Sequence, residues 1–269
     1  MEVSFGAVGK NKGHWFKLKG DLPHTGQKVR SIPDFFDAVV KNTIVNSIKV
    51  LEKTSWPPYG FLERAMHSVL APAIFSASDW ALLEYPTSRE TANDERRGSG
   101  WIDYLAQYNG ASFIIELKKE FLSARKKLYV QKRSRTYSRR KLFISKYVKS
   151  LWGEANAQCR NTGDIVDSFH PCWPVAMMAL TVYETVSGEG AKANQPRYEP
   201  SDQELIDTAK EILLGGLTED ETNKPNLVYC WKPPQSQREK GWPLEVDEKE
   251  PPQFRLYSAV FFIFRIHAQ

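Results

Sequence analysis

The sequence predicts an α/β protein in which a mixed β-sheet is flanked by helices. Segments with helical periodicity alternate with segments of strand length along much of the chain. The last segment, Arg255–His267, is apolar on both of its faces, as is typical of a strand inside a sheet that is covered on both sides. The expected order is helices, three strands, a helix, a strand, a helix and two strands.

The N-terminal part is expected to be an arm followed by two helices. Residues 1–30 are rich in Gly and Lys and predict an irregular arm or a short hairpin. Apolar residues in Ile32–Glu52 recur at about 3.6-residue spacing, which predicts a helix that ends before a Trp-Pro-Pro sequence. A second helix is expected over residues 60–70, stopped near Pro72.

The next segments predict a short strand, a loop and a pair of strands. Trp80–Tyr85 has strand character, whereas residues 86–100 are polar and charged and predict a loop. Trp101–Tyr108 and Ala111–Lys118 predict two adjacent strands.

The C-terminal half predicts alternating helices and strands. A helical pattern covers Phe143–Arg160, and Pro174–Thr185 predicts a buried strand. Ser201 is expected to cap a helix over 202–214, with an acid three residues on completing a capping box. Residues 226–232 predict another strand. No domain boundary is evident, so we expect a single domain over residues 1–269, with a core at about 60–185 and the strands within 226–267 completing the sheet.

Composition excludes several classes of protein. The chain has 269 residues and is 41% hydrophobic, which does not suit a disordered chain. No apolar run reaches the roughly 18 residues of a membrane span, and the first residues lack the apolar core of a signal peptide. We therefore expect a cytoplasmic protein with no membrane partner. Cys159, Cys172 and Cys230 form no CxxC pair, which disfavours structural zinc and a disulfide framework.

Positive charge is concentrated in one segment. Residues 118–149 hold thirteen of the 37 Lys and Arg residues and one acid, Glu120. Such a block repels itself unless it meets a polyanion, and interleaved tyrosines suit stacking on bases. We expect nucleic acid as the partner, with residues 126–141 disordered until they bind; the alternative is a solvated helix and loop. The residues expected to contact nucleic acid are Arg125, Lys126, Lys127, Lys132, Arg133, Arg135, Arg139, Arg140 and Lys141.

An Asn-Gly dipeptide at residues 109–110 fixes the register of the two central strands. This dipeptide is the strongest short signal for a two-residue type I′ hairpin turn. With that turn, Tyr108 lies opposite Ala111, and Asp103 lies opposite Glu116. Two opposed carboxylates have Cβ atoms about 5 Å apart and repel by about 3 kcal/mol at an effective dielectric of about 20. A divalent cation would remove this cost.

Strand alternation is expected to give this hairpin one chemical face and one buried face. Asp103, Glu116 and Lys118 share the first face, and Ile102 and Tyr104 belong to the apolar second face. Lys118 would place a positive charge beside a metal ion, where it can orient water and stabilise a charged transition state. The alternative is a surface hairpin with a cross-strand salt bridge.

These residues resemble the motif of the PD-(D/E)XK nuclease superfamily, which is restriction-endonuclease-like. The match consists of Asp103 followed by Glu116-Leu117-Lys118, with Ile102 where the motif's Pro would stand. The resemblance covers roughly residues 60–185 and implies a central mixed sheet flanked by helices.

The resemblance also implies further site residues. An upstream helix often supplies another acid, for which Glu63 is the first candidate and Glu84 the second. The helix after the motif often carries a Gln, for which Gln158 is the candidate, with Glu154 as the alternative. Among the histidines, only His67 stands out, because it lies one helical turn after Glu63.

The leading hypothesis is therefore a metal-dependent nuclease that hydrolyses phosphodiester bonds, in DNA more than in RNA. Asp103, Glu116 and Glu63 would bind Mg²⁺ or Mn²⁺, and Lys118 and Gln158 would complete the catalytic site. A homodimer would suit cleavage of both strands of a duplex. The alternative hypothesis is a catalytically inactive nuclease-like module that binds nucleic acid or protein.

Overall fold

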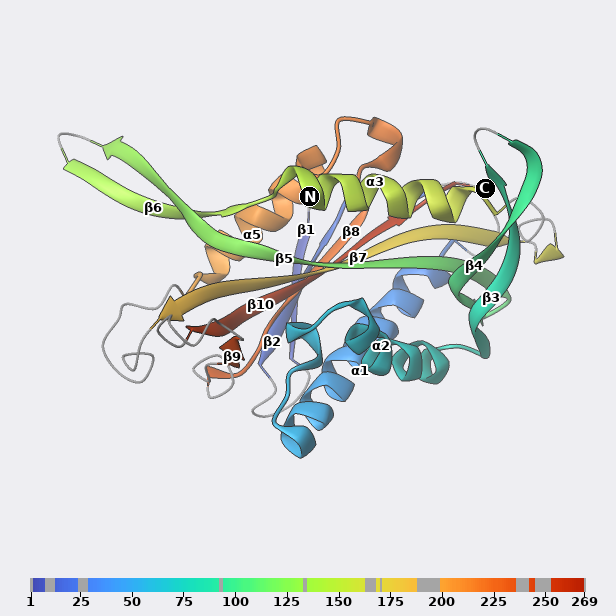
Figure 1. Ribbon diagram of the computed structural model, residues 1–269, viewed down its shortest axis with the longest axis horizontal. Helices are drawn as coiled ribbons and strands as arrows, with labels where there is room; N and C mark the ends of the chain where they lie inside the picture. Colours follow the sequence, from blue (N-terminus) through green and yellow to red (C-terminus); the bar gives the residue numbers. More distant parts are fainter. Residues whose placement is uncertain are drawn as a thin grey trace.

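A mixed β-sheet with helices on both faces forms the body of the protein, which confirms the expected class. In the computed structural model α1 and α2 cover one face of the sheet, and α3 and α5 cover the other (Figure 1). The residues that the structure describes are 2–7, 13–23, 29–91, 94–132, 135–162, 168–169, 171–187, 199–235, 242–244 and 253–268.

The described strands join one sheet in the order β1-β2-β8-β10-β7-β5-β4-β3, with β6 pairing with β5 and β9 with β10. Among the described pairs, β5 and β7 are parallel and the others antiparallel, so the sheet is mixed. The strands are β1 (Glu2–Ala7), β2 (His14–Lys19), β3 (Trp80–Thr91), β4 (Asp94–Tyr108), β5 (Ala111–Lys132), β6 (Arg135–Phe143), β7 (Cys172–Ser187), β8 (Leu227–Lys232), β9 (Trp242–Leu244) and β10 (Gln253–Ile266).

Helix α3 connects the two parallel strands. Parallel neighbours need a crossover connection, and α3 supplies it on the face that it shares with α5. The helices are α1 (Ser31–Thr54), α2 (Glu63–Ala77), α3 (Lys146–Arg160) and α5 (Asp202–Glu211), with short helical turns η1 (Pro58–Gly60), η3 (Ile212–Gly216) and η4 (Glu221–Asn223).

Stacked aromatic rings hold α1 against the sheet. The rings of Phe35 and Phe113 stack at 4.5 Å between centroids with an interplanar angle of 10°. Phe36 contacts both Phe113 and Phe264, and all four side chains are fully buried. Large aromatic rings bury much apolar area each, so these contacts anchor this face of the core.

A polar contact next to these rings fastens the same helix to β8 and β2. Asp37 of α1 accepts hydrogen bonds from Tyr229 of β8 at 2.6 Å and from Lys17 of β2 at 2.8 Å. Burial, and then the nearby carboxylate of Asp37, raise the pKa of Tyr229 well above its usual value, so its hydroxyl stays a donor. The N-terminal hairpin β1–β2 is thereby tied into the sheet beside β8, which confirms the short-hairpin alternative for residues 1–30.

Helix α2 runs past the position where it was expected to stop. It ends at Ala77 and contains Pro72, which costs a backbone hydrogen bond inside the helix. Ala73 and Ile74 are fully buried, and their packing in the core offsets that cost. The expectation of an end near Pro72 was therefore wrong, because tertiary packing outweighed local propensity.

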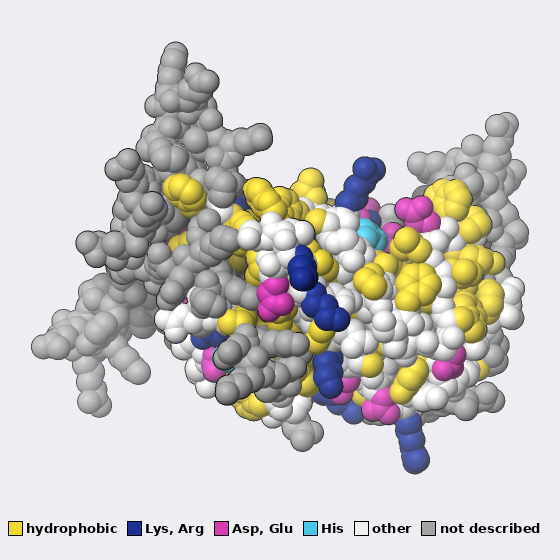
Figure 2. Space-filling model, turned by 90° about the horizontal axis from the view of Figure 1, so that it is seen from below, with side chains coloured by type: hydrophobic (Ala, Val, Ile, Leu, Met, Phe, Trp, Pro, Cys, Tyr) yellow, Lys and Arg dark blue, Asp and Glu magenta, His cyan; other side chains and the backbone are white. Residues whose placement is uncertain are grey.

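Within the polar segment expected as a loop at residues 86–100, the described residues 86–91 and 94–100 are instead strand. β3 and β4 pair from Trp80↔Gln107 to Thr91↔Asp94. A two-stranded ribbon is held by backbone hydrogen bonds between its strands. These bonds do not require alternating apolar side chains, so the sequence pattern did not predict the strands. Seen from the side of α1 and α2, hydrophobic side chains gather toward one end of the molecule (Figure 2).

Two other expectations from the sequence are confirmed. Ser201 caps α5, and both halves of the capping box with Glu204 are present. β10 lies between β7 and β8, inside the sheet, as its two apolar faces required.

We predict that Phe113→Ala will lower the free energy of unfolding by about 3–5 kcal/mol, because it removes a fully buried ring from the stack with Phe35. The matched control is Phe75→Ala, since the Phe75 side chain is 47% exposed, and its effect should stay below about 1 kcal/mol. Urea unfolding of the three proteins measures both values. Equal losses in the two variants would contradict this account of the core.

Candidate active site

The Asn-Gly turn forms as expected and sets the register. Asn109 has φ of 50° and Gly110 has φ of 73°, the positive values that a type I′ turn requires. β4 and β5 then pair from Tyr108↔Ala111 to Tyr104↔Ile115. The register predicted from the dipeptide is confirmed over this ladder.

The ladder ends one residue before the two predicted acids. Asp103 and Glu116 are not a ladder pair. Instead, Asp103 Oδ2 accepts a hydrogen bond from the backbone N–H of Leu117 at 2.7 Å. β4 and β5 therefore diverge at this point, and the carboxylate of Asp103 takes the place of a strand partner.

Strand alternation also breaks at this point, which corrects the expected faces. Ile102 packs with Leu105 and Ile114, whereas Tyr104 belongs to the core under α1 and α2. The expectation that Ile102 and Tyr104 share a face was wrong. The neighbouring strand is irregular here too, because Glu84 of β3 has φ of 53°, an unusual value for a residue other than Gly.

Acidic side chains bind the backbone N–H groups along the exposed edge of β5. The β4 ladder ends at Ile115 and the β6 ladder begins at Ser123, so on this edge the residues between them have no described strand partner. The N–H of Leu117 binds Asp103, that of Lys119 binds Glu63, and that of Phe121 binds Glu120 Oε1 at 2.8 Å. Each unpaired N–H of an edge needs such an acceptor.

Glu63 reaches this edge from the first turn of α2. Burial raises the pKa of its carboxyl; Lys118 opposes that shift, Asp103 adds to it, and His67 and the Lys119 N–H oppose it. Glu63, Asp103 and Lys118 therefore lie within electrostatic reach of one another. The helix acid expected from the family resemblance is brought to the predicted strand residues.

A histidine and a tyrosine extend this cluster. His67 Nδ1 is hydrogen-bonded to the hydroxyl of Tyr104, which is fully buried. Burial, and then the charges of Asp103 and Glu63, raise the pKa of Tyr104, so its hydroxyl stays protonated. Sequence reasoning treated Tyr104 as core alone; its position one residue after Asp103 was the available signal.

On the other face of the sheet, α3 contacts Lys118. Lys118 Nζ lies 3.3 Å from Glu154 Oε1, and Gln158 Nε2 donates to the same oxygen at 3.2 Å. Within the described structure, the buried Oε1 of Gln158 has no hydrogen-bond partner. Glu154 thus links Lys118 to Gln158, and both candidates for the helix position lie beside the predicted lysine.

Glu116 is more deeply buried than the other acids. Its residue is 2% exposed. Burial, and then the charge of Glu116, raise the pKa of Cys159 on α3 to about 12, which places Glu116 near that thiol. Glu116 is therefore covered by α3, whereas Asp103 and Glu63 meet at the strand edge.

A Mg²⁺ or Mn²⁺ ion fits only part of this arrangement. Among the described residues, no group of three or more His, Cys, Asp or Glu side chains is placed to hold a metal ion. The expected trio of Asp103, Glu116 and Glu63 is thus not assembled as one ligand set. Asp103 and Glu63 do place two mutually repelling carboxyl groups near each other, and Mg²⁺ commonly binds one or two carboxylates together with waters and phosphate oxygens.

Lys119 is a charged residue that sequence reasoning missed. It is 6% exposed, its Nζ donates to Glu120 O at 2.9 Å, and it lies 3.8 Å from the ring centroid of Phe121. Burial lowers the pKa of Lys119 to about 7, with Arg255 adding to the effect and Glu120 opposing it.

The basic segment forms two strands rather than a disordered chain or a helix and loop. Residues 126–132 of β5 pair with 135–141 of β6. The backbone of the predicted nucleic-acid contacts therefore lies on one hairpin, apart from Arg133, which falls outside the described residues. Over residues 126–132 and 135–141, regular backbone pairing replaces the expected disorder.

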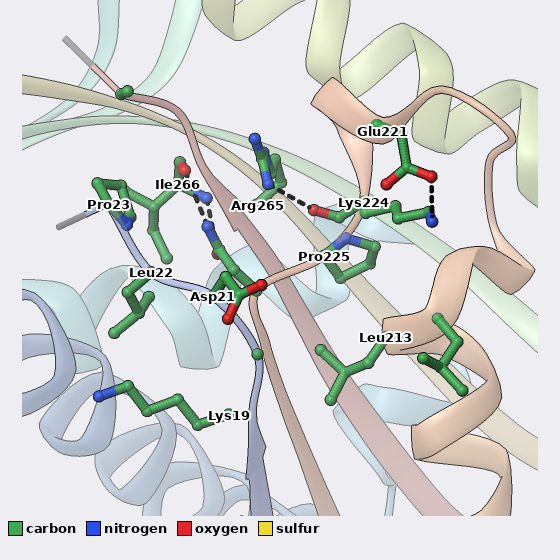
Figure 3. A pocket seen from close by; sticks show the side chains of 14 residues that line it. Lys19, Asp21, Leu22, Pro23, Leu213, Glu221, Lys224, Pro225, Arg265 and Ile266 are labelled. Atoms are coloured by element: carbon green, nitrogen blue, oxygen red, sulfur yellow. Dashed lines mark hydrogen bonds and ion pairs between the residues drawn. The ribbon is translucent and has the colours of Figure 1, made fainter. Parts of the chain in front are cut away.

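A separate pocket lies at the C-terminal end of β10, on the side of the sheet toward β8 and β2. It has a volume of about 540 Å³ and is lined by residues from β2, η3, β10 and the segment before β8 (Figure 3). Arg265 donates to Lys224 O at 2.9 Å, and Lys224 is ion-paired with Glu221. These partners account for much of the charge in its lining, and we assign it no role.

Comparisons with known proteins leave the class to be argued from this geometry. No family model, no curated protein and no solved structure matches the chain. None of the helices in the described part of the chain is both long and apolar enough to cross a membrane.

We predict that Lys119→Met will stabilise the protein near pH 6 and flatten its stability at higher pH. The folded protein loses the Lys119 proton above about pH 7, whereas the unfolded chain keeps it up to about pH 10.5. Between these values the unfolded state binds more protons, so this residue makes stability rise with pH, by at most about 1.4 kcal/mol per pH unit. Below about pH 7 the full cost of the buried charge remains.

Urea unfolding from pH 6 to 9.5 measures this effect as the difference between wild type and variant. Lys53→Met on α1 is the control, because Lys53 is exposed. A difference between wild type and Lys119→Met that does not change over this pH range would rule out the explanation.

Proposed function

We propose that the protein is a metal-dependent nuclease that hydrolyses phosphodiester bonds, in DNA more than in RNA. The observation that carries the proposal is that Glu63 and Asp103 bind neighbouring N–H groups of β5 where β4 leaves it, within electrostatic reach of Lys118. The two carboxylates provide oxygen ligands for a divalent cation. The nearby lysine provides a positive charge for a phosphate.

The order of elements also supports the proposal. Helix α2 precedes the β3–β4–β5 meander, and α3 leads to β7, which is parallel to β5. The resemblance to the PD-(D/E)XK superfamily implies a mixed sheet flanked by helices with an acid from the upstream helix, and Glu63 lies on α2. We therefore extend the proposal to a restriction-endonuclease-like core.

Each candidate residue has a distinct part in the proposed reaction. Asp103 and Glu63 would hold Mg²⁺ or Mn²⁺, and Glu116, which α3 covers, would contribute only if its side chain turned toward them; a bound ion would supply Lewis acidity and activate water. Lys118 would stabilise the charge that develops on the phosphate. Glu154 holds Lys118 in place, and the unpartnered oxygen of Gln158 can accept a hydrogen bond from water or substrate.

A second candidate function is a catalytically inactive module that binds nucleic acid or protein. The observation in its favour is that Glu116 is 2% exposed and that Lys118 is paired with Glu154. A buried acid and a lysine that is already ion-paired suit a structural role as well as a catalytic one.

We predict that Glu63→Gln, Asp103→Asn and Lys118→Ala will each lower DNA cleavage at least 100-fold in Mg²⁺ or Mn²⁺, and that EDTA will abolish it. Each change removes an oxygen ligand or the charge beside the phosphate, which commonly costs this much. Plasmid and single-stranded DNA, followed on gels, give the rates. Glu116→Gln is included, and we expect the same loss.

Glu52→Gln and Lys53→Ala serve as matched controls, because both residues are exposed on α1. Melting temperatures of all variants separate loss of chemistry from loss of fold. Full cleavage by Asp103→Asn or Lys118→Ala would refute the nuclease assignment at this site. Salt-dependent DNA binding without cleavage in any metal would instead establish the inactive module.

A further inference from the structure

The basic hairpin extends beyond the rest of the sheet. β5 pairs with β7 as far as Ser123↔Tyr183, and its remaining described residues pair with β6 alone. Figure 1 shows this two-stranded ribbon projecting from the layered body. We name residues 126–132 and 135–141 the basic ribbon.

Positively charged residues are opposed across the basic ribbon. The register pairs Lys126 with Lys141, Lys127 with Arg140, and Lys132 with Arg135. Like charges directly opposite each other destabilise a strand pair, and residues 121–153 contain no acid that could compensate within the segment. A polyanion between or beside the strands would remove this repulsion.

The register also places cations at positions of both faces of the ribbon. Successive strand positions belong to opposite faces, so the pairs at Lys126 and Lys132 belong to one face of the ribbon and the pair at Lys127 belongs to the opposite face. A ribbon in a groove of a duplex has a phosphate backbone on each side, which suits charge on both faces. The major groove of DNA, about 12 Å wide, admits a two-stranded β-ribbon.

Single-stranded nucleic acid suits the ribbon less well. Proteins that bind single strands combine charge with a series of aromatic platforms on which successive bases stack. The basic ribbon carries two aromatic residues, Tyr129 and Tyr137, whereas seven of its fourteen residues are Lys or Arg.

The length of β5 sets an upper limit to the distance between the ribbon and the candidate active site. Lys126 and Lys132 come eight and fourteen residues after Lys118 on the same strand. At about 3.3 Å per residue these separations are about 26 and 46 Å. Along a duplex with about 3.4 Å per base pair, they correspond to about 8 and 14 base pairs.

We propose that the basic ribbon docks in a groove of double-stranded DNA about 8–14 base pairs to one side of the phosphate held at the edge of β5. The position of the cut in this inference rests on the proposed function. The binding of duplex DNA rests on the ribbon alone. The ribbon selects duplex over single-stranded DNA and requires a flank of that length on one side of the cut.

The first test measures binding in EDTA, where no metal-dependent cleavage occurs. The probes are a 30-base-pair duplex DNA of mixed sequence and its single strands, each labelled with a fluorophore, and anisotropy gives the affinity. The ribbon variant is Lys126→Gln/Lys127→Gln/Lys132→Gln. The control, Lys41→Gln/Lys49→Gln/Lys53→Gln on α1, removes the same charge from exposed positions.

We expect the ribbon variant to lose at least tenfold in duplex affinity, and its slope of log affinity against log salt to fall by about 2–3. The control variant should stay within about twofold of wild type, and single strands should bind more weakly than the duplex. Equal losses in the two variants, or a loss on single strands as large as on the duplex, would overturn the proposal. Circular dichroism confirms that each variant is folded.

The second test varies the flank. Cleavage of duplexes whose flank on one side is shortened from 16 to 4 base pairs should slow at least tenfold once the flank falls below about 8 base pairs, and the ribbon variant should lose this dependence. A rate independent of flank length would overturn the placement of the ribbon. Duplex binding without any cleavage would leave the ribbon assignment intact and refute the nuclease proposal alone, so the two failures are distinguishable.

Discussion

The organisation of the candidate site depends on the need to satisfy the backbone N–H groups of β5 after β4 leaves it. A strand edge without a partner must find other acceptors or lose stability. Here the acceptors are carboxylates, from Asp103 on the departing strand and Glu63 on α2. The same bonds that complete the sheet therefore fix two acids beside each other and join α2 to β5.

β5 connects the two layers of the molecule because its successive side chains reach opposite faces. Leu117 belongs to the core under α1 and α2, and Lys118 contacts Glu154 of α3. The parallel pairing of β5 with β7 requires the α3 crossover, and that crossover brings Glu154 and Gln158 to Lys118. The residues around the edge thus come from segments far apart in the sequence through the topology of one strand.

Short sequence motifs correctly predicted the features that depend on neighbouring residues alone. The Asn-Gly turn fixed the β4–β5 register, and the capping box at Ser201 fixed the start of α5. The continuation of α2 through Pro72 depends on distant packing, so local propensity misplaced its end. The sequence did not predict how the candidate residues are arranged: the divergence of β4 from β5 at Asp103 has no short-range signal, and Asp103 and Glu116 form no ladder pair there.

Several energetic costs of this fold lie around the same edge. Lys119 is buried with a pKa lowered to about 7, and Glu63 has a raised pKa. Glu84 on β3, the strand next to β4, has a positive φ. Much of the remaining core is apolar, as in the stack of Phe35 and Phe113, although burial also lowers the pKa of His267 to about 3. A sequence selected for stability alone would replace such residues with apolar ones. Their collection at one edge is expected where charge is needed for binding or chemistry.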